Sequence, residues 1–124
     1  MTTRVLLIDD DVDEHEVFSS ALKNYNSNII CITANSWAES DTLLKHFRPD
    51  VVFIDMNMPI INGIDSLKKI KEIPDLKNAR LYIYSAGLYA AHEKEALELG
   101  ALGWVKKPRD VKGYECYSKN CLNL

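Results

Sequence analysis

The sequence predicts an α/β protein built on a parallel sheet, and three observations support this prediction. Five short apolar runs rich in Val and Ile alternate with segments of helical periodicity, which is typical of repeated βα units. Several of these runs are continuously apolar, as expected for strands that are covered on both faces. The length of 124 residues suffices for one domain with a core of its own. We therefore expect residues 1–124 to form a single doubly wound domain with right-handed crossovers.

The five predicted strands are separated by segments that contain turn residues. In chain order the strands are RVLLI, NIICITA, DVVFI, ARLYIY and LGWV. Pro, Gly and Asn occur at the junctions in NSNI, FRPD, MPIING and IPDLKN, which indicates loops at these places.

Two of the intervening segments have a clear apolar helical face. The first face consists of Val17, Phe18, Ala21, Leu22 and Tyr25, and the second of Ile64, Leu67 and Ile70. Asp11 or Asp13 could cap the first of these helices. Near the end of the chain we expect a short fifth helix over residues 111–120, in which Gly113 costs about 1 kcal/mol relative to Ala.

Composition excludes several classes of protein. The formal net charge of -3 gives no basis for nucleic acid as a direct ligand, and no apolar run is long enough for membrane insertion. The N-terminal segment turns acidic where a signal peptide would need a long apolar stretch, so we expect a cytoplasmic protein. The odd number of cysteines, without metal-type spacing, predicts free thiols at Cys31, Cys116 and Cys121.

Polar side chains follow the predicted strands at the edge where parallel sheets bind ligands. The first strand runs into the acids of residues 9–11, the third ends at Asp55, the fourth at Ser85, and the fifth runs out through Lys107. Each of these residues alone could be a helix cap or a solvated charge. Together they would place several carboxylates at one edge, and their repulsion needs a cation or another strong partner to offset it.

The motifs LLIDDD, VVFIDMNMPIING, YIYSA and ALELGALGWVKKP occur in an order that resembles the receiver (CheY-like) domain of two-component response regulators. The resemblance covers residues 4–109. It implies a flavodoxin-like fold, with a five-stranded sheet of order 2-1-3-4-5; the chemotaxis member is itself an example given for this topology.

The resemblance also implies the roles of four residues around a metal ion. Asp55 would be the phosphoacceptor, and Asp9 and Asp10 would hold a divalent cation, Mg²⁺ or Mn²⁺, together with Asp55. The backbone carbonyl of Asn57 would complete this metal site. The chemistry agrees, because Mg²⁺ prefers oxygen ligands and typically uses one or two carboxylates together with phosphate oxygens.

Three further residues acquire roles from the same similarity. Ser85 and Lys107 would contact the phosphoryl group, and Trp104 would be the switch aromatic residue that responds through Ser85. Positive charge and hydroxyl donors stabilise phosphoryl oxygens as charge redistributes during transfer. Ala86, directly after Ser85, leaves room for a phosphodonor.

The implied function is that of a response regulator receiver, not of an enzyme with a separate substrate. It would accept a phosphoryl group from a sensor histidine kinase or a histidine phosphotransfer protein and act on an unidentified downstream protein. A homodimer could form through the face made by the fourth helix, the fifth strand and the fifth helix. The chain would be either a stand-alone regulator or part of a longer protein.

Two other classes of function were weighed against this one. A phosphatase similar to the haloacid dehalogenases would use a strand-one acid as its nucleophile, and DDDVD contains the D-x-D spacing. That family requires Thr or Val where Asp13 stands, and the chain is too short for a cap domain. The other alternative is a pseudo-receiver, an interaction module that keeps the fold without phosphorylation.

Overall fold

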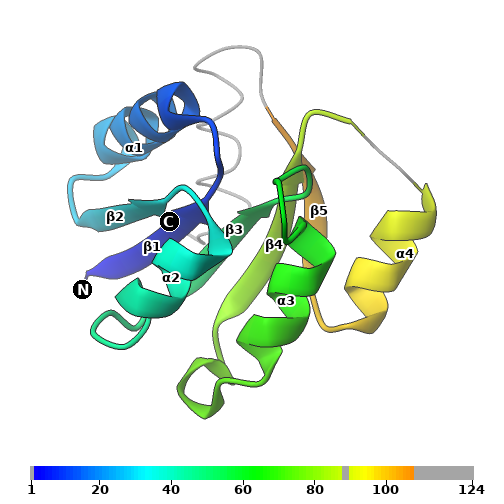
Figure 1. Cartoon of the computed structure of the whole chain (residues 1–124). Helices are drawn as coiled ribbons and strands as arrows, with labels where there is room; N and C mark the ends of the chain where they lie inside the picture. The colour runs from blue at the N-terminus through cyan, green and yellow to red at the C-terminus, as the bar shows by residue number, and fades with distance from the viewer. Residues whose placement is uncertain (1, 88–89, 108–124) are drawn as a thin grey trace.

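The computed structural model describes residues 2–87 and 90–107, in which five strands form one sheet. The strands are β1 (Thr3–Ile8), β2 (Ile29–Ala34), β3 (Val51–Asp55), β4 (Arg80–Ser85) and β5 (Gly103–Lys106). All neighbouring strands are parallel, and their order is β2-β1-β3-β4-β5 (Figure 1). The predicted fold class and strand order are thus confirmed.

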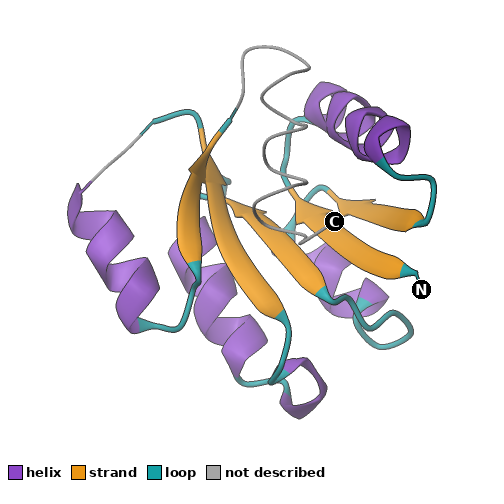
Figure 2. Cartoon of the chain, turned by 180° about the vertical axis from the view of Figure 1, so that it is seen from behind, coloured by secondary structure: helices purple, strands orange, loops and turns teal. Residues whose placement is uncertain are grey.

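Helices cover both faces of the sheet (Figures 1 and 2). They are α1 (Val12–Tyr25), α2 (Trp37–Leu43), α3 (Gly63–Lys71) and α4 (Ala90–Glu98), with a 3₁₀ turn at Pro74–Leu76. No helix in residues 2–87 and 90–107 is long and apolar enough to cross a bilayer. The fifth helix predicted at residues 111–120 lies outside the described residues.

Strand β3 is buried along its whole length because each face packs against a different core. Val52 and Ile54 join the core under α2, α3 and α4. Val51 and Phe53 join the core under α1, where the ring of Phe53 meets the ring of Phe18 edge-on at a centroid distance of 5.2 Å. This double burial explains the continuous apolar run, and it fixes the position of Asp55 at the end of the strand.

Helix α1 starts immediately after the acidic segment that ends β1. The side chain of Asp11 accepts a hydrogen bond from the backbone N–H of Asp13 at 3.0 Å. Of the two candidates from the sequence, Asp11 is therefore the N-cap of α1, and Asp13 is not. Phe18, Ala21 and Leu22 are buried as predicted.

The prediction for Val17 was wrong, because its side chain is 50% exposed. Val17 lies at the edge of the apolar stripe, where a turn of about 100° per residue carries it away from the sheet. The second predicted face is confirmed, since Ile64, Leu67 and Ile70 are all buried in α3.

Candidate functional site

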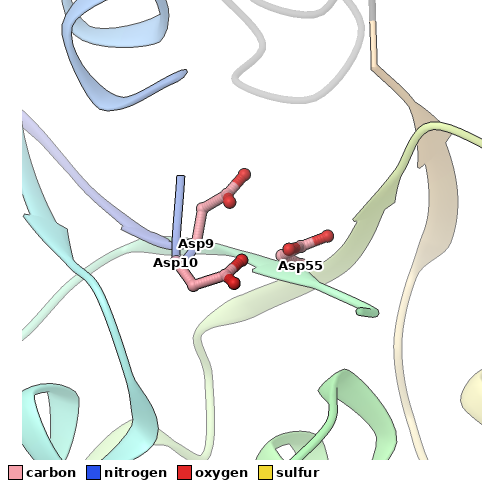
Figure 3. Close-up of side chains that lie close together, drawn as sticks. All are labelled: Asp9, Asp10 and Asp55. Carbon is pink, nitrogen blue, oxygen red and sulfur yellow. The ribbon is translucent and has the colours of Figure 1, made fainter. Parts of the chain in front are cut away.

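Three carboxylates gather where β1 and β3 end, as Figure 3 shows for Asp9, Asp10 and Asp55. One carboxylate oxygen from each residue lies within 4.8 Å of one from each of the other two. Strands β1 and β3 are neighbours in the sheet, so their ends bring the acids together as predicted. Asp9 is fully buried and Asp55 is 4% exposed, whereas Asp10 is exposed to solvent.

The loop after β3 folds back tightly onto the end of that strand. The backbone N–H of Gly63 donates to the carbonyl of Met56 at 3.0 Å. A Cβ atom at residue 63 would lie 2.6 Å from the carbonyl oxygen of Asp55, so only glycine permits this approach. The backbone N–H of Asn57 points at Asp55 Oδ1 from 3.4 Å. Asn57 is therefore adjacent to the acid cluster, and the role of its carbonyl as a metal ligand stays a prediction.

The loop between β1 and α1 holds Asp9 from several directions. The backbone N–H of Asp11 donates to Asp9 Oδ1 at 3.0 Å. The side-chain Nε2 of His15, in the first turn of α1, is hydrogen-bonded to the backbone carbonyl of Asp9. Asp9 is thus oriented by the same turn of chain that begins the helix.

Lys107 supplies the positive charge of the site from the end of β5. Its Nζ atom lies 2.9 Å from Asp9 Oδ2 and 3.5 Å from Asp55 Oδ1. Its backbone N–H donates to the carbonyl of Ser85 at 2.7 Å, which fixes the residue beside the end of β4. The structure thereby brings Lys107 to the acid cluster, as the order of the strands predicted.

The charges of the cluster shift the protonation of its members. Burial, followed by repulsion from Asp9, raises the pKa of Asp55 to about 7, although Lys107 and the N–H of Asn57 act in the opposite direction. Burial also disfavours the charged form of Lys107. The hydrogen bond to Asp9 and the charge of Asp55 outweigh this effect and raise the pKa of Lys107. Without a bound cation, Asp55 is therefore largely neutral at pH values below about 7.

Ser85 and Trp104 are linked through the loop that follows β4. Ser85 is fully buried, and its Oγ accepts a hydrogen bond from the N–H of Gly87 at 3.3 Å. The carbonyl of Gly87 accepts a hydrogen bond from Trp104 Nε1 at 3.0 Å. Trp104 is therefore connected to Ser85 through Gly87, and the role of Ser85 as a phosphoryl ligand stays a prediction.

One contact beside the site was not anticipated from the sequence. The hydroxyl of Tyr84, directly before Ser85, donates to Glu14 Oε1 of α1 at 2.6 Å. The Nζ atom of Lys107 lies 5.4 Å from the centroid of the Tyr84 ring. The available signal was Tyr84 in the predicted strand, because a buried phenol needs a polar partner. Its partner could not be read from spacing along the chain.

The arrangement is suited to binding a hard cation and a phosphoryl group. Carboxylate and carbonyl oxygens are ligands for Mg²⁺ or Mn²⁺, and the described residues add no thiolate or imidazole to the cluster of Asp9, Asp10 and Asp55. Lys107 adds an ammonium group beside Asp9 and Asp55, and Ser85 adds a hydroxyl at the neighbouring end of β4. A buried carboxylate beside cation ligands and an ammonium group is suited to phosphoryl transfer to aspartate.

A doubly wound sheet with this set of residues at its carboxyl edge defines a CheY-like receiver. The family model described as the response regulator receiver domain matches residues 5–113. The chain therefore belongs to the response regulator receiver family.

Individual relatives agree with this assignment. A protein-glutamate methylesterase/protein-glutamine glutaminase of Caulobacter vibrioides is 36% identical over 112 residues, which are 89% of this chain and 32% of that protein. The first curated relatives are all about three times as long as the matched segment, so the chain spans about a third of their length. Their enzymatic names therefore describe proteins of which this chain matches only a part.

Solved structures show the same fold at low sequence identity. The chemotaxis protein CheY4 of Vibrio cholerae superposes with a TM-score of 0.87 at 22% identity, over 97% of this chain and 98% of the other. The Mn²⁺-bound form of the response regulator Rcp1 superposes with a TM-score of 0.85 at 20% identity, over 97% and 94% of the two chains.

Proposed function

We propose that Asp55 accepts a phosphoryl group from a sensor histidine kinase or a histidine phosphotransfer protein. The observation that carries the proposal is a buried carboxylate with two further acids within 4.8 Å and a lysine ammonium at 3.5 Å. The chain would act as a phosphoacceptor that works on a downstream protein, not as an enzyme with a separate substrate.

The acid cluster fits a divalent cation. All three side chains offer oxygen ligands, and burial together with mutual repulsion disfavours the charged form of Asp55 when no cation is bound. Asp9, Asp10, Asp55 and the backbone carbonyl of Asn57 would hold Mg²⁺ or Mn²⁺. The bound ion would supply positive charge that keeps Asp55 ionised and stabilises phosphoryl oxygens.

The protein groups then divide the work of transfer. An oxygen of Asp55 forms a bond to phosphorus while the bond from phosphorus to the donor's nitrogen breaks. Lys107 Nζ faces the phosphoryl oxygens and neutralises part of their charge, and the Ser85 hydroxyl donates a hydrogen bond to one of them. Both groups lie at the neighbouring ends of β4 and β5, where the backbone N–H of Lys107 donates to the carbonyl of Ser85.

The test is incubation with Mg²⁺ and acetyl phosphate, followed by intact-mass measurement. We expect the mass gain of one phosphoryl group in the wild-type chain and none in Asp55→Asn. Asp75→Asn is a matched control, because Asp75 is an exposed aspartate paired with Arg48, away from the acid cluster. A full mass gain in Asp55→Asn would contradict the assignment, and no gain in the wild type would favour the pseudo-receiver.

We propose in addition that Trp104 reports phosphorylation through Ser85 and Gly87. If the Ser85 hydroxyl turned toward the phosphoryl group, its hydrogen bond from the N–H of Gly87 would break. The carbonyl of Gly87 accepts the hydrogen bond from Trp104 Nε1, so this change would reach the indole. The indole would then change its packing against the α4 side of the sheet, which alters the populations of two arrangements. That side includes the face through which the homodimer could form.

Fluorescence can test this second proposal. In Trp37→Phe, Trp104 is the sole tryptophan, and beryllofluoride stands in for the phosphoryl group. We expect an emission change on binding that is lost in Ser85→Ala. An unchanged spectrum at full occupancy would show that Trp104 is purely structural.

A further inference from the structure

The hydrogen bond between Tyr84 and Glu14 joins two elements that the sheet itself keeps apart. Tyr84 lies in β4 and Glu14 in the first turn of α1, 70 residues away along the chain. Strand β3 stands between β1 and β4, so no backbone ladder connects the β1–α1 segment to β4. The 2.6 Å contact from the phenol to the carboxylate bridges this gap.

Both ends of the contact are rigid. The ring of Tyr84 is fully buried and meets the rings of Phe18 and Phe53 edge-on, with centroid distances of 5.4 and 6.1 Å. Glu14 follows the Asp11 cap by three residues, in the turn of α1 that directly continues the loop of Asp9. The contact therefore fixes the loop that carries the metal-binding acids relative to β4.

The site consists of two halves that meet at Asp55. Asp9 and Asp10 come from the β1–α1 loop, whereas Ser85 and Lys107 come from the ends of β4 and β5. Several side-chain contacts of the described residues cross from one half to the other. They include the ion pair between Lys107 and Asp9 at 2.9 Å, the Tyr84–Glu14 hydrogen bond and the edge-on contact of the Phe18 and Tyr84 rings.

The ion pair and the hydrogen bond respond differently when a phosphoryl group is bound. Lys107 has a single ammonium group, which lies 2.9 Å from Asp9 and 3.5 Å from Asp55. A phosphoryl group on Asp55 adds negative charge on that side and draws the ammonium group away from Asp9. The Tyr84–Glu14 bond involves neither the metal ligands nor the phosphoryl ligands, so it persists together with the ring contact of Phe18 and Tyr84 and is then the polar contact on which the connection depends.

We propose that Glu14 and Tyr84 are positioning residues that hold the metal-binding half against the phosphoryl-binding half in the phosphorylated state. This inference rests on the proposed function, because it concerns the geometry around a phosphoryl group on Asp55. Neither residue belongs to the proposed metal or phosphoryl ligands, and both would act through the loop of Asp9 and through Ser85, which is adjacent to Tyr84.

The test compares the binding of two probes, Mg²⁺ alone and beryllofluoride at saturating Mg²⁺, by titration calorimetry. Tyr84→Phe keeps the ring and its contact with Lys107 but removes the hydroxyl. Because a hydrogen bond to a charged group is among the stronger ones, we expect beryllofluoride to bind about tenfold more weakly in this variant. We expect the affinity for Mg²⁺ alone to stay within about twofold, since the Lys107–Asp9 pair still joins the halves in that state.

Three variants of α1 complete the design. Glu14→Ala should reproduce the effect of Tyr84→Phe. Glu14→Gln keeps an acceptor oxygen for the phenol and should retain most of the wild-type affinity for beryllofluoride, which separates positioning from the charge of Glu14. Glu16→Ala is the matched control, because Glu16 is an exposed acid on the same helix, and it should leave both affinities unchanged.

The outcomes separate this inference from the proposed function. If the wild-type chain binds no beryllofluoride and gains no phosphoryl group, the proposed function fails first. If the wild type binds it normally, equal losses of both affinities in Tyr84→Phe and Glu14→Ala would show a general structural role and overturn the inference. Unchanged affinities in both variants would overturn it as well, and a loss confined to beryllofluoride would support it.

Discussion

Gly63 sets the sharpest steric constraint near the site, and its substitution gives a direct test of the loop geometry. In Gly63→Ala the new Cβ would lie 2.6 Å from the carbonyl oxygen of Asp55 and 2.7 Å from the Cα atom of Met56. Both atoms belong to the backbone, and Asp55 is anchored in the buried strand β3. Neither can move aside as a flexible side chain would, so the loop or the start of α3 has to shift.

The size of the effect follows from two opposing contributions. Overpacking against a fixed backbone typically costs about 1–3 kcal/mol, and contacts this short belong at the upper end. Gly63 is the first residue of α3, where the higher helix propensity of Ala would stabilise the fold by less than about 1 kcal/mol. We therefore expect Gly63→Ala to lower the free energy of unfolding by about 2 kcal/mol.

Urea unfolding in metal-free buffer measures this difference. Gly103→Ala is the matched control, because its Cβ would meet only the Tyr82 ring, at an ordinary distance of 3.4 Å, and the loss of chain entropy in the unfolded state favours Ala. An unfolding free energy of Gly63→Ala within about 0.5 kcal/mol of the wild type would refute the steric argument.

Three further predictions concern charge and thiol chemistry. Mg²⁺ at about 100 times its dissociation constant should raise the free energy of unfolding of the wild type by roughly 2.7 kcal/mol. Asp10→Ala should be more stable than the wild type without metal and should gain little stability from Mg²⁺. Equal Mg²⁺-induced shifts of the melting temperature in the wild type and in Asp10→Ala would refute the metal site. The pKa of Asp55 is raised to about 7, so its contribution to metal-free stability is greatest below its ordinary pKa and is lost as the pH rises through about 7. Asp55→Asn should therefore become increasingly more stable than the wild type between pH 5 and pH 8 in urea unfolding, and a constant difference would contradict the shift. Burial raises the pKa of the Cys31 thiol to about 11. In the variant Cys116→Ser, Cys121→Ser, iodoacetamide should therefore react with Cys31 about 100-fold more slowly than with free cysteine at pH 8. Mass spectrometry can follow this reaction.

Sequence patterns were sufficient where burial on both faces or strand order decides the structure. The run VVFID predicted a strand that ends at Asp55, and the strand ends there because both of its faces pack against helices. The meeting of Asp9, Asp10 and Asp55 followed from the rule that parallel strands end at one edge. These features depend on local composition and on general rules of chain topology.

Other features depend on atoms that only the folded chain brings together. The choice of Asp11 over Asp13 as the helix cap depends on where the first turn of α1 begins, which periodicity fixes only to within a residue or two. The exposure of Val17 depends on how α1 is rotated against the sheet. The Tyr84–Glu14 bond spans 70 residues, a separation that neither helical nor strand periodicity predicts.

The central place of β3 in the sheet has a consequence for how the molecule opens in solution. Its backbone amides are hydrogen-bonded between β1 and β4, so their exchange with deuterium requires disruption of the middle of the sheet. The edge strands β2 and β5 have only one neighbour each among the described residues and can separate from the sheet at lower cost. We therefore expect β3, which ends at Asp55, to be the slowest-exchanging strand, and a chemical change at Asp55 to alter the exchange of the surrounding loops before that of the strand itself.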